Sequence, residues 1–140
     1  MKYSYFFFSF TLLFVLYSCN KEAQNFITFH DSNYNELVNE TTLVDLNSSY
    51  DLIIKVGFES DVHGPVYSIR KNEDAEIQLD EESPEYYNRE GHGWNGSDRL
   101  HTEQVRISLD FNYSDFNSGD QVQIICRHSG IEKNQTFIIQ

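Results

Sequence analysis

The feature that most constrains the fold is a strict alternation of apolar and polar side chains in short runs. Every second residue is apolar over 105–111, and the pattern returns over 122–127 after a turn at 117–120. The same alternation runs through 50–59. A period of two residues is the signature of a strand that buries one face. Long helical patterns and internal repeats are absent from the sequence, so it predicts an all-β protein.

Shorter runs add further candidate strands. These lie at residues 26–30, 42–46, 66–71, 76–80 and 137–139. A single helical turn that starts at Asp31 or Ser32 and carries Tyr34, Leu37 and Val38 is a weaker expectation. Strands separated by turn residues every 8–12 positions are typical of an antiparallel β-sandwich.

The C-terminal third also carries a resemblance. Residues 116–126 are similar to the E–F loop entering strand F of an immunoglobulin-like or fibronectin-III-like domain, and 127–139 resemble its F–G hairpin and strand G. The resemblance implies an antiparallel immunoglobulin-like β-sandwich of about seven strands over residues 26–140. Two departures stand out. Val122 occupies the place where a corner tyrosine often sits, and the strand at 50–59 has no cysteine to pair with Cys126.

The N-terminus has the pattern of a signal peptide. Lys2 precedes an apolar run over 5–17, which is shorter than the roughly 20 residues of a membrane-spanning helix. The four residues that follow, Leu16-Tyr17-Ser18-Cys19, resemble a bacterial lipobox. The resemblance implies a signal peptide over 1–18 and a lipid on Cys19, which would be the contact with the membrane. Residues 19–25 would then be the lipidated cysteine and a short tether.

The residues after Cys19 bear on the location. The residue after Cys19 is Asn20 and not Asp, which by resemblance to Gram-negative lipoproteins argues against retention at the inner membrane. Lys21-Glu22 resembles the charged surface-export tags of some Bacteroidota lipoproteins. We therefore expect a lipid-anchored envelope protein, with the outer membrane and its surface favoured over the inner membrane. The alternative is a eukaryotic secreted glycoprotein domain. It is motivated by five glycosylation sequons, at Asn39, Asn47, Asn95, Asn112 and Asn134.

The charge excludes some partners. The chain has 10 basic and 22 acidic residues, a net charge of −12, and removing residues 1–18 removes only Lys2 and leaves −13. Nucleic acid is not an expected partner, because phosphate contacts need a basic face. An alternative function follows from the same charge: an acidic inhibitor or immunity-type protein that neutralises a cationic enzyme.

The segment 80–101 lacks apolar periodicity and is the candidate site. Either Tyr86 and Tyr87 begin a short edge strand, or the segment is a functional loop. Its aromatic and polar residues are predicted to bind a protein or glycan. They are Tyr86, Tyr87, Trp94, Asn95 and Asp98, and Trp94 is the only tryptophan of the chain. The alternative is that these rings fold back over the end of the sandwich.

The sequence shows no catalytic motif. The five histidines show no metal-ligand spacing, and Cys126 lies at an inward strand position where a small inert core residue is expected. No cofactor is expected; a calcium ion bound by Asp80, Glu81 or Asp98 is a weaker alternative. The sequence therefore predicts an envelope lipoprotein that acts as a non-catalytic binding module, not an enzyme.

Overall fold

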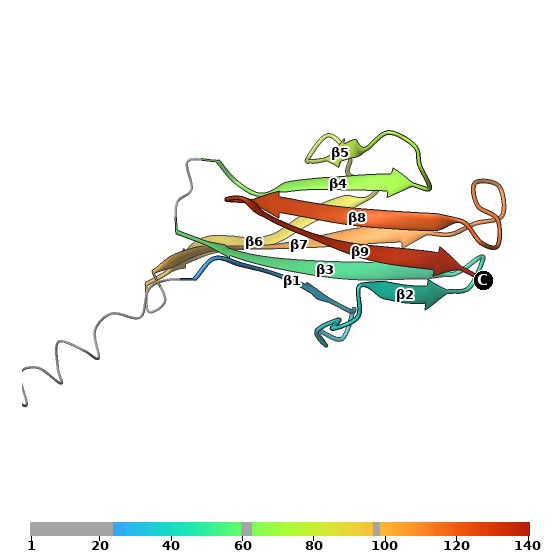
Figure 1. The fold of residues 1–140 in the computed structure, drawn as a ribbon. Helices are drawn as coiled ribbons and strands as arrows, with labels where there is room; N and C mark the ends of the chain where they lie inside the picture. The colour runs from blue at the N-terminus through green and yellow to red at the C-terminus, as the bar shows by residue number, and fades with distance from the viewer. Residues whose placement is uncertain (1–23, 60–62, 97–98) are drawn as a thin grey trace, which may run out of the picture.

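The computed structural model describes residues 24–59, 63–96 and 99–140, and this part of the chain forms two packed β-sheets (Figure 1). The first sheet has the order β1 (Phe26–His30), β3 (Ser49–Phe58), β7 (Leu100–Asp110), β6 (Tyr87–Asn95). The second has the order β2 (Thr41–Val44), β9 (Ile131–Ile139), β8 (Gln121–His128), β4 (Val66–Lys71), β5 (Ile77–Leu79). The predicted all-β, immunoglobulin-like sandwich is confirmed.

The strand count and one pairing differ from the prediction. The described residues form nine strands where about seven were expected, because short β2 and β5 flank the second sheet. β2 pairs with β9 in parallel, whereas every other pair is antiparallel. The predicted helical turn after Asp31 was wrong. Tyr34 adopts a left-handed φ of 64°, and the Asp31 carboxylate accepts hydrogen bonds from the Asn33 and Asn35 amides, which closes a tight turn.

The alternating residues meet between the sheets, as their period requires. Most of the buried side chains come from the facing sides of β3, β7, β8 and β9. They include Leu52, Ile54, Val56, Phe58, Val105, Ile107, Leu109, Ile124, Cys126 and Phe137. The turn between β8 and β9 has positive φ at both central residues, Ser129 (48°) and Gly130 (78°), which is the two-residue hairpin geometry that matches strand twist.

A polar link crosses the core and connects the two sheets. The Tyr67 hydroxyl on β4 donates a 2.8 Å hydrogen bond to the carboxylate of Glu103 on β7, and Glu103 is only 4% exposed. Burial, together with the nearby Glu103 charge, raises the pKa of Tyr67 well above its usual range. Cys126, directly across from Tyr67 in the β4–β8 pair, is buried and free, and burial raises its thiol pKa to about 12. The predicted core position of Cys126 is therefore confirmed.

The sandwich has two distinct ends. Phe26 at the start of β1 lies beside Gly57 at the end of β3, and the C-terminal strand β9 finishes at the opposite end (Figure 1). A Cβ on Gly57 would approach the Phe26 ring to 2.2 Å, so a glycine is needed where this ring covers the strand. At about 3.3 Å per residue, the ten residues of β3 separate the two ends by roughly 30 Å.

Candidate functional site

The predicted 80–101 segment is mostly strand. β6 is an edge strand that pairs along its length with β7, so the edge-strand alternative is confirmed and extends to nine residues. Tyr86 and Trp94 are eight residues apart along this edge, roughly 25 Å, and therefore lie towards opposite ends of the sandwich. The structure does not gather the predicted residues into one site. Asp98, like Cys19 and the signal peptide, lies outside the described residues.

The three predicted aromatic residues have different surroundings. Tyr87 is 7% exposed and packs against Tyr67, with 5.8 Å between ring centroids, so for this residue the ring does fold into the core. Tyr86 is 40% exposed at the start of β6 and lines a groove at the end where β9 finishes. Trp94 is 56% exposed at the other end of the strand, with Asn95 half-buried beside it.

A β-bulge determines which way Trp94 faces. Arg89 is opposite Val105 and Gly91 is opposite Gln104, so Glu90 is an extra residue with no partner position on β7. Its carboxylate instead accepts hydrogen bonds from the side chains of Gln104 (2.7 Å) and Arg106 (2.5 Å). Because the period is two, one inserted residue moves every later side chain to the other face.

The bulge therefore places His92 and Trp94 on the core-facing side of the sheet. They oppose Glu103 and His101, which stand on the same face of β7 as the buried Val105. If β6 paired regularly, with Glu90 opposite Gln104, this face would carry Gly91 and Gly93 and would present no ring. The bulge at Glu90 is thus the local feature that creates an aromatic surface here.

Four rings form a continuous row across this end, which we call the ring row: Trp94, His101, Phe58 and His128. The ring centroids are 4.8 Å apart from Trp94 to His101, 5.7 Å from His101 to Phe58, and 4.5 Å from Phe58 to His128. His92 adds a side branch, stacked at 6.5 Å from His101. The row follows the strand order β6, β7, β3 and then crosses to β8 on the second sheet.

Sheet length explains why part of this row is open. The β6–β7 end of the first sheet extends beyond the second sheet at the end where β1 begins (Figure 1). Phe58 is still covered by the second sheet and is buried, whereas Trp94 on the same face is beyond that cover. The overhang turns a core-type face into an accessible one, and contact with His101 holds the exposed indole in place.

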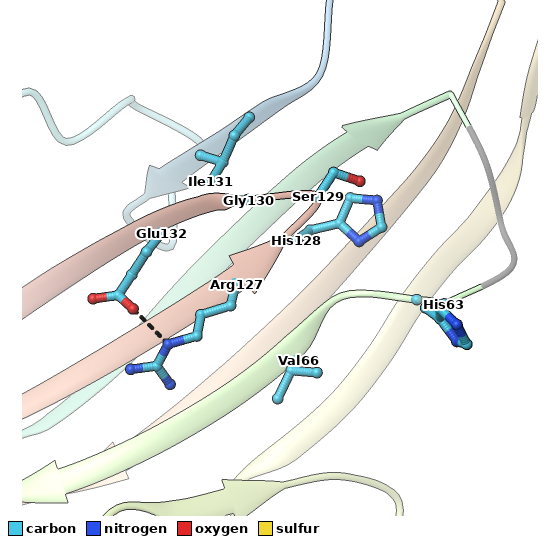
Figure 2. A pocket seen from close by; sticks show the side chains of 9 residues that line it. His63, Val66, Arg127, His128, Ser129, Gly130, Ile131 and Glu132 are labelled. Atoms are coloured by element: carbon cyan, nitrogen blue, oxygen red, sulfur yellow. Dashed lines mark hydrogen bonds and ion pairs between the residues drawn. The ribbon is translucent and has the colours of Figure 1, made fainter.

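A pocket of about 580 Å³ adjoins the buried end of the ring row. Figure 2 shows the Arg127–Glu132 ion pair on one side of the pocket and His63 on the other, with His128 between them. The Nε2 atom of His128 is enclosed and has no hydrogen-bond partner among the described residues. Three of the lining residues carry a basic side chain: His63, Arg127 and His128.

The Arg127 charge is already engaged by the protein. Its guanidinium binds Glu76 through two hydrogen bonds (2.7 and 3.0 Å) and Glu132 through one (2.5 Å), and these bonds raise its pKa further. The guanidinium therefore braces the pocket wall, whereas the imidazoles of His63 and His128 present nitrogen atoms near it. Hydrogen bonding and ring stacking are the chemistry that this surface offers.

Metal binding gains no support in the described part of the chain. No group of three His, Cys, Asp or Glu side chains is placed there to hold an ion. Of the calcium candidates, the Asp80 carboxylate accepts a hydrogen bond from the Glu82 amide at 2.9 Å, and Glu81 pairs with Arg89 at 3.5 Å. Within the same ranges no helix is long and apolar enough to cross a membrane.

Sequence reasoning missed the residues that support Trp94. His101 and Glu103 continue the odd-numbered alternation of 105–111 backwards, and that parity places them on the inward face. Phe58 ends the 50–59 run on the inward face as well, but its contact with His101 depends on strand pairing that no local pattern reveals.

The chain matches no family model, and no curated protein is similar to it. The candidate function therefore depends on the geometry of the surface itself.

Proposed function

We propose that this chain is a lipid-anchored envelope protein whose domain binds a glycan without transforming it, through Trp94 and the open part of the ring row. The observation that carries the proposal is the half-exposed indole on a paired strand, braced at 4.8 Å by His101. An aromatic face fixed in this way stacks on the apolar face of a sugar ring at little entropic cost. His92, on the same face of the sheet, supplies a polar group beside it.

The proposed anchor favours a glycan over a soluble protein. Phe26 is seven positions after Cys19 in the sequence, and an extended chain spans at most about 25 Å over this distance. Phe26 and Trp94 lie at the same end of the sandwich, so a lipid on Cys19 keeps the ring row close to the membrane surface. Saccharides attached to that surface reach this space easily, whereas a large soluble protein has to enter a narrow gap.

The binding test uses the full chain in detergent and purified envelope polysaccharides. Trp94 is the only tryptophan, so its fluorescence reports binding at the proposed site directly. We expect saturable emission changes in the wild type and, by co-sedimentation, binding that is lost in Trp94→Ala. The matched control is Tyr113→Ala, which removes a 68% exposed ring from the loop between β7 and β8 at the opposite end.

Equal binding by wild type and Trp94→Ala would refute the proposed site. A Trp94-dependent envelope protein in place of a glycan would keep the site and change the ligand class. Trp94→Ala has to remain folded for this comparison. We expect its free energy of unfolding to lie within about 1 kcal/mol of the wild-type value, because the side chain is largely solvent-exposed.

The anchor has its own test. Metabolic palmitate labelling of the chain is expected to disappear in Cys19→Ser and to persist in Cys126→Ser, because the Cys126 thiol is buried. Label that persists in Cys19→Ser would exclude the lipobox interpretation and, with it, the argument for a membrane-proximal ring row.

A further inference from the structure

The opposite end of the sandwich contains a groove of about 710 Å³ that the proposed function does not use. We call it the acidic groove. It lies where β3 begins, β7 ends and β6 starts, and Tyr86 forms part of its wall. Its apolar lining comes from both sheets and consists of Ile69, Leu109, Phe111, Phe116 and Val122. The groove therefore has a floor on which aliphatic or planar groups can pack.

The charged residues that line this groove are all acidic. Four carboxylates line it, those of Asp51, Glu85, Asp110 and Asp115, and none of its lining residues is Lys, Arg or His. Asp51 pairs with Arg106 at 3.0 Å and accepts a 2.8 Å hydrogen bond from Ser108. None of the ion pairs within the described ranges involves the other three. A cleft lined by like charges over low-dielectric walls concentrates a negative potential.

The rim of the groove already binds one cation of the chain itself. The Lys71 ammonium lies 4.7 Å from the centroid of the Phe116 ring and pairs with Asp120 at 3.3 Å. It also donates to the carbonyl oxygen of Asp115. A cation held over an aromatic ring and against a carboxylate is thus part of the native structure at the groove's edge.

The geometry points to the acidic groove as a receptor for an arginine side chain of a partner protein. A guanidinium is planar and stacks on a ring such as that of Tyr86, which is 40% exposed, and its five donors can serve several carboxylates at once. The aliphatic part of the side chain matches the apolar floor. Lysine offers a compact charge without the planar face, so it satisfies this groove less well. The groove lies roughly 30 Å from Trp94, so this inference does not depend on the proposed glycan site.

The first test compares two isosteric probes on the full-length wild-type chain. We would titrate a blocked Gly-Arg-Gly tripeptide and its citrulline analogue, which has the same shape but no charge, and follow backbone amide shifts by NMR. Saturable shifts are expected at Ser49, Ser108 and Asn112 with arginine and not with citrulline. Equal shifts with both peptides, or shifts spread over surface carboxylates elsewhere, would overturn the inference.

The second test separates the groove from net charge. The variant Glu85→Gln/Asp110→Asn/Asp115→Asn removes three groove carboxylates. The control Glu36→Gln/Glu40→Gln/Glu82→Gln removes three exposed carboxylates outside the groove. We expect the groove variant to bind the arginine peptide at least tenfold more weakly and the control to change affinity by less than about twofold, because the net charge changes equally.

Equal losses in both variants would show general electrostatic attraction and refute the groove. Trp94→Ala is expected to bind the arginine peptide as wild type does, so failure of the glycan proposal and failure of this one are distinguishable. If the groove variant does not fold, the comparison of arginine with citrulline on the wild type still decides the question.

Discussion

The two ends of this sandwich offer different binding chemistry although the same strands build both. At one end the first sheet extends past the second and exposes a row of rings with three basic residues around the adjoining pocket. At the other end the sheets enclose a groove with an apolar floor and four carboxylates. The net charge of −12 is therefore unevenly distributed, and an average over the chain describes neither end.

This difference also shows how the relative lengths of the two sheets determine which side chains are accessible at each end of a sandwich. The inward face of each strand is committed to the core, so an inward-facing side chain can meet a ligand only near a strand end. Where one sheet overhangs, core-facing rings become accessible; where both sheets end together, loops and carboxylates close over a groove. The four predictions below test whether the two ends act independently, in order of decreasing expected effect.

The largest effect is expected from removing the buried phenylalanine at each end. Phe58→Ala and Phe111→Ala each delete a fully buried ring and should lower the free energy of unfolding by about 3–5 kcal/mol. Phe58→Ala should also disturb the ring row and spare the acidic groove, whereas Phe111→Ala should do the reverse. Urea unfolding with the two binding assays checks both points. A loss below about 1 kcal/mol, or loss of both activities in one folded variant, would contradict the independence of the ends.

Removing the hydrogen bond between Tyr67 and Glu103 should lower stability without changing binding at one end more than at the other. Tyr67→Phe removes the donor to one oxygen of the buried Glu103 carboxylate, whose other oxygen lies 3.5 Å from Arg89. An unsatisfied buried acceptor costs about 1–3 kcal/mol. Tyr113→Phe is the matched control, because its ring is exposed and should change stability by less than about 0.5 kcal/mol. Denaturant midpoints compare the two variants, and equal midpoints would mean that the link does not stabilise the fold.

Deleting Glu90 should remove the bulge without moving Trp94 or the acidic groove. With Glu90 gone, Arg89 stays opposite Val105 and Gly91 stays opposite Gln104, so Trp94 remains opposite His101. We expect a cost of about 1 kcal/mol or less, since the surface ion pair of Glu90 with Arg106 is lost. Urea unfolding measures this cost, and the emission of Trp94 and both binding assays should match wild type. A shifted emission or lost glycan binding in the folded variant would show that the strand after the deletion pairs out of phase with β7.

The smallest effect concerns the pH dependence of the groove end. Hydrogen bonds from the Asn117 amide and the Asn72 side chain, with the Lys71 charge nearby, hold the pKa of Asp120 below its ordinary value of 3.8. A lowered folded-state pKa stabilises the fold above the unfolded pKa, and this contribution is lost as the pH falls through the folded value. Asp120→Asn should therefore lower the urea midpoint at neutral pH and match wild type in strong acid. A deficit that persists unchanged in acid would exclude ionisation as its cause.

Strands were predicted well from the sequence wherever apolar and polar side chains alternate. The runs at 26–30 and 66–71 match β1 and β4, and the C-terminal hairpin with its turn at Ser129 and Gly130 is where the resemblance implied it. The bulge was not predicted, because Gly91 and Gly93 have no side chains and hide the change of phase around His92.

The candidate site was predicted only in part. Trp94 is exposed as expected, but Tyr87 belongs to the core and Tyr86 to a different surface. The acidic groove joins segments from residue 47 to residue 122, whose proximity follows from long-range strand pairing. Alternation tells which side chains face inward, but it does not tell which strands become neighbours, so no local pattern could have assembled this groove.

The hydrogen bond between Tyr67 and Glu103 has a consequence for how the protein matures. It connects the two sheets without a covalent crosslink, and the only cysteine in the described residues is buried without a partner. The domain therefore requires no oxidant and no thiol-exchange catalyst to reach its native state, and reductants have no crosslink within it to break. Its folding should proceed alike in the reducing interior of a cell and in an oxidising exterior, including envelopes that lack disulfide-forming enzymes.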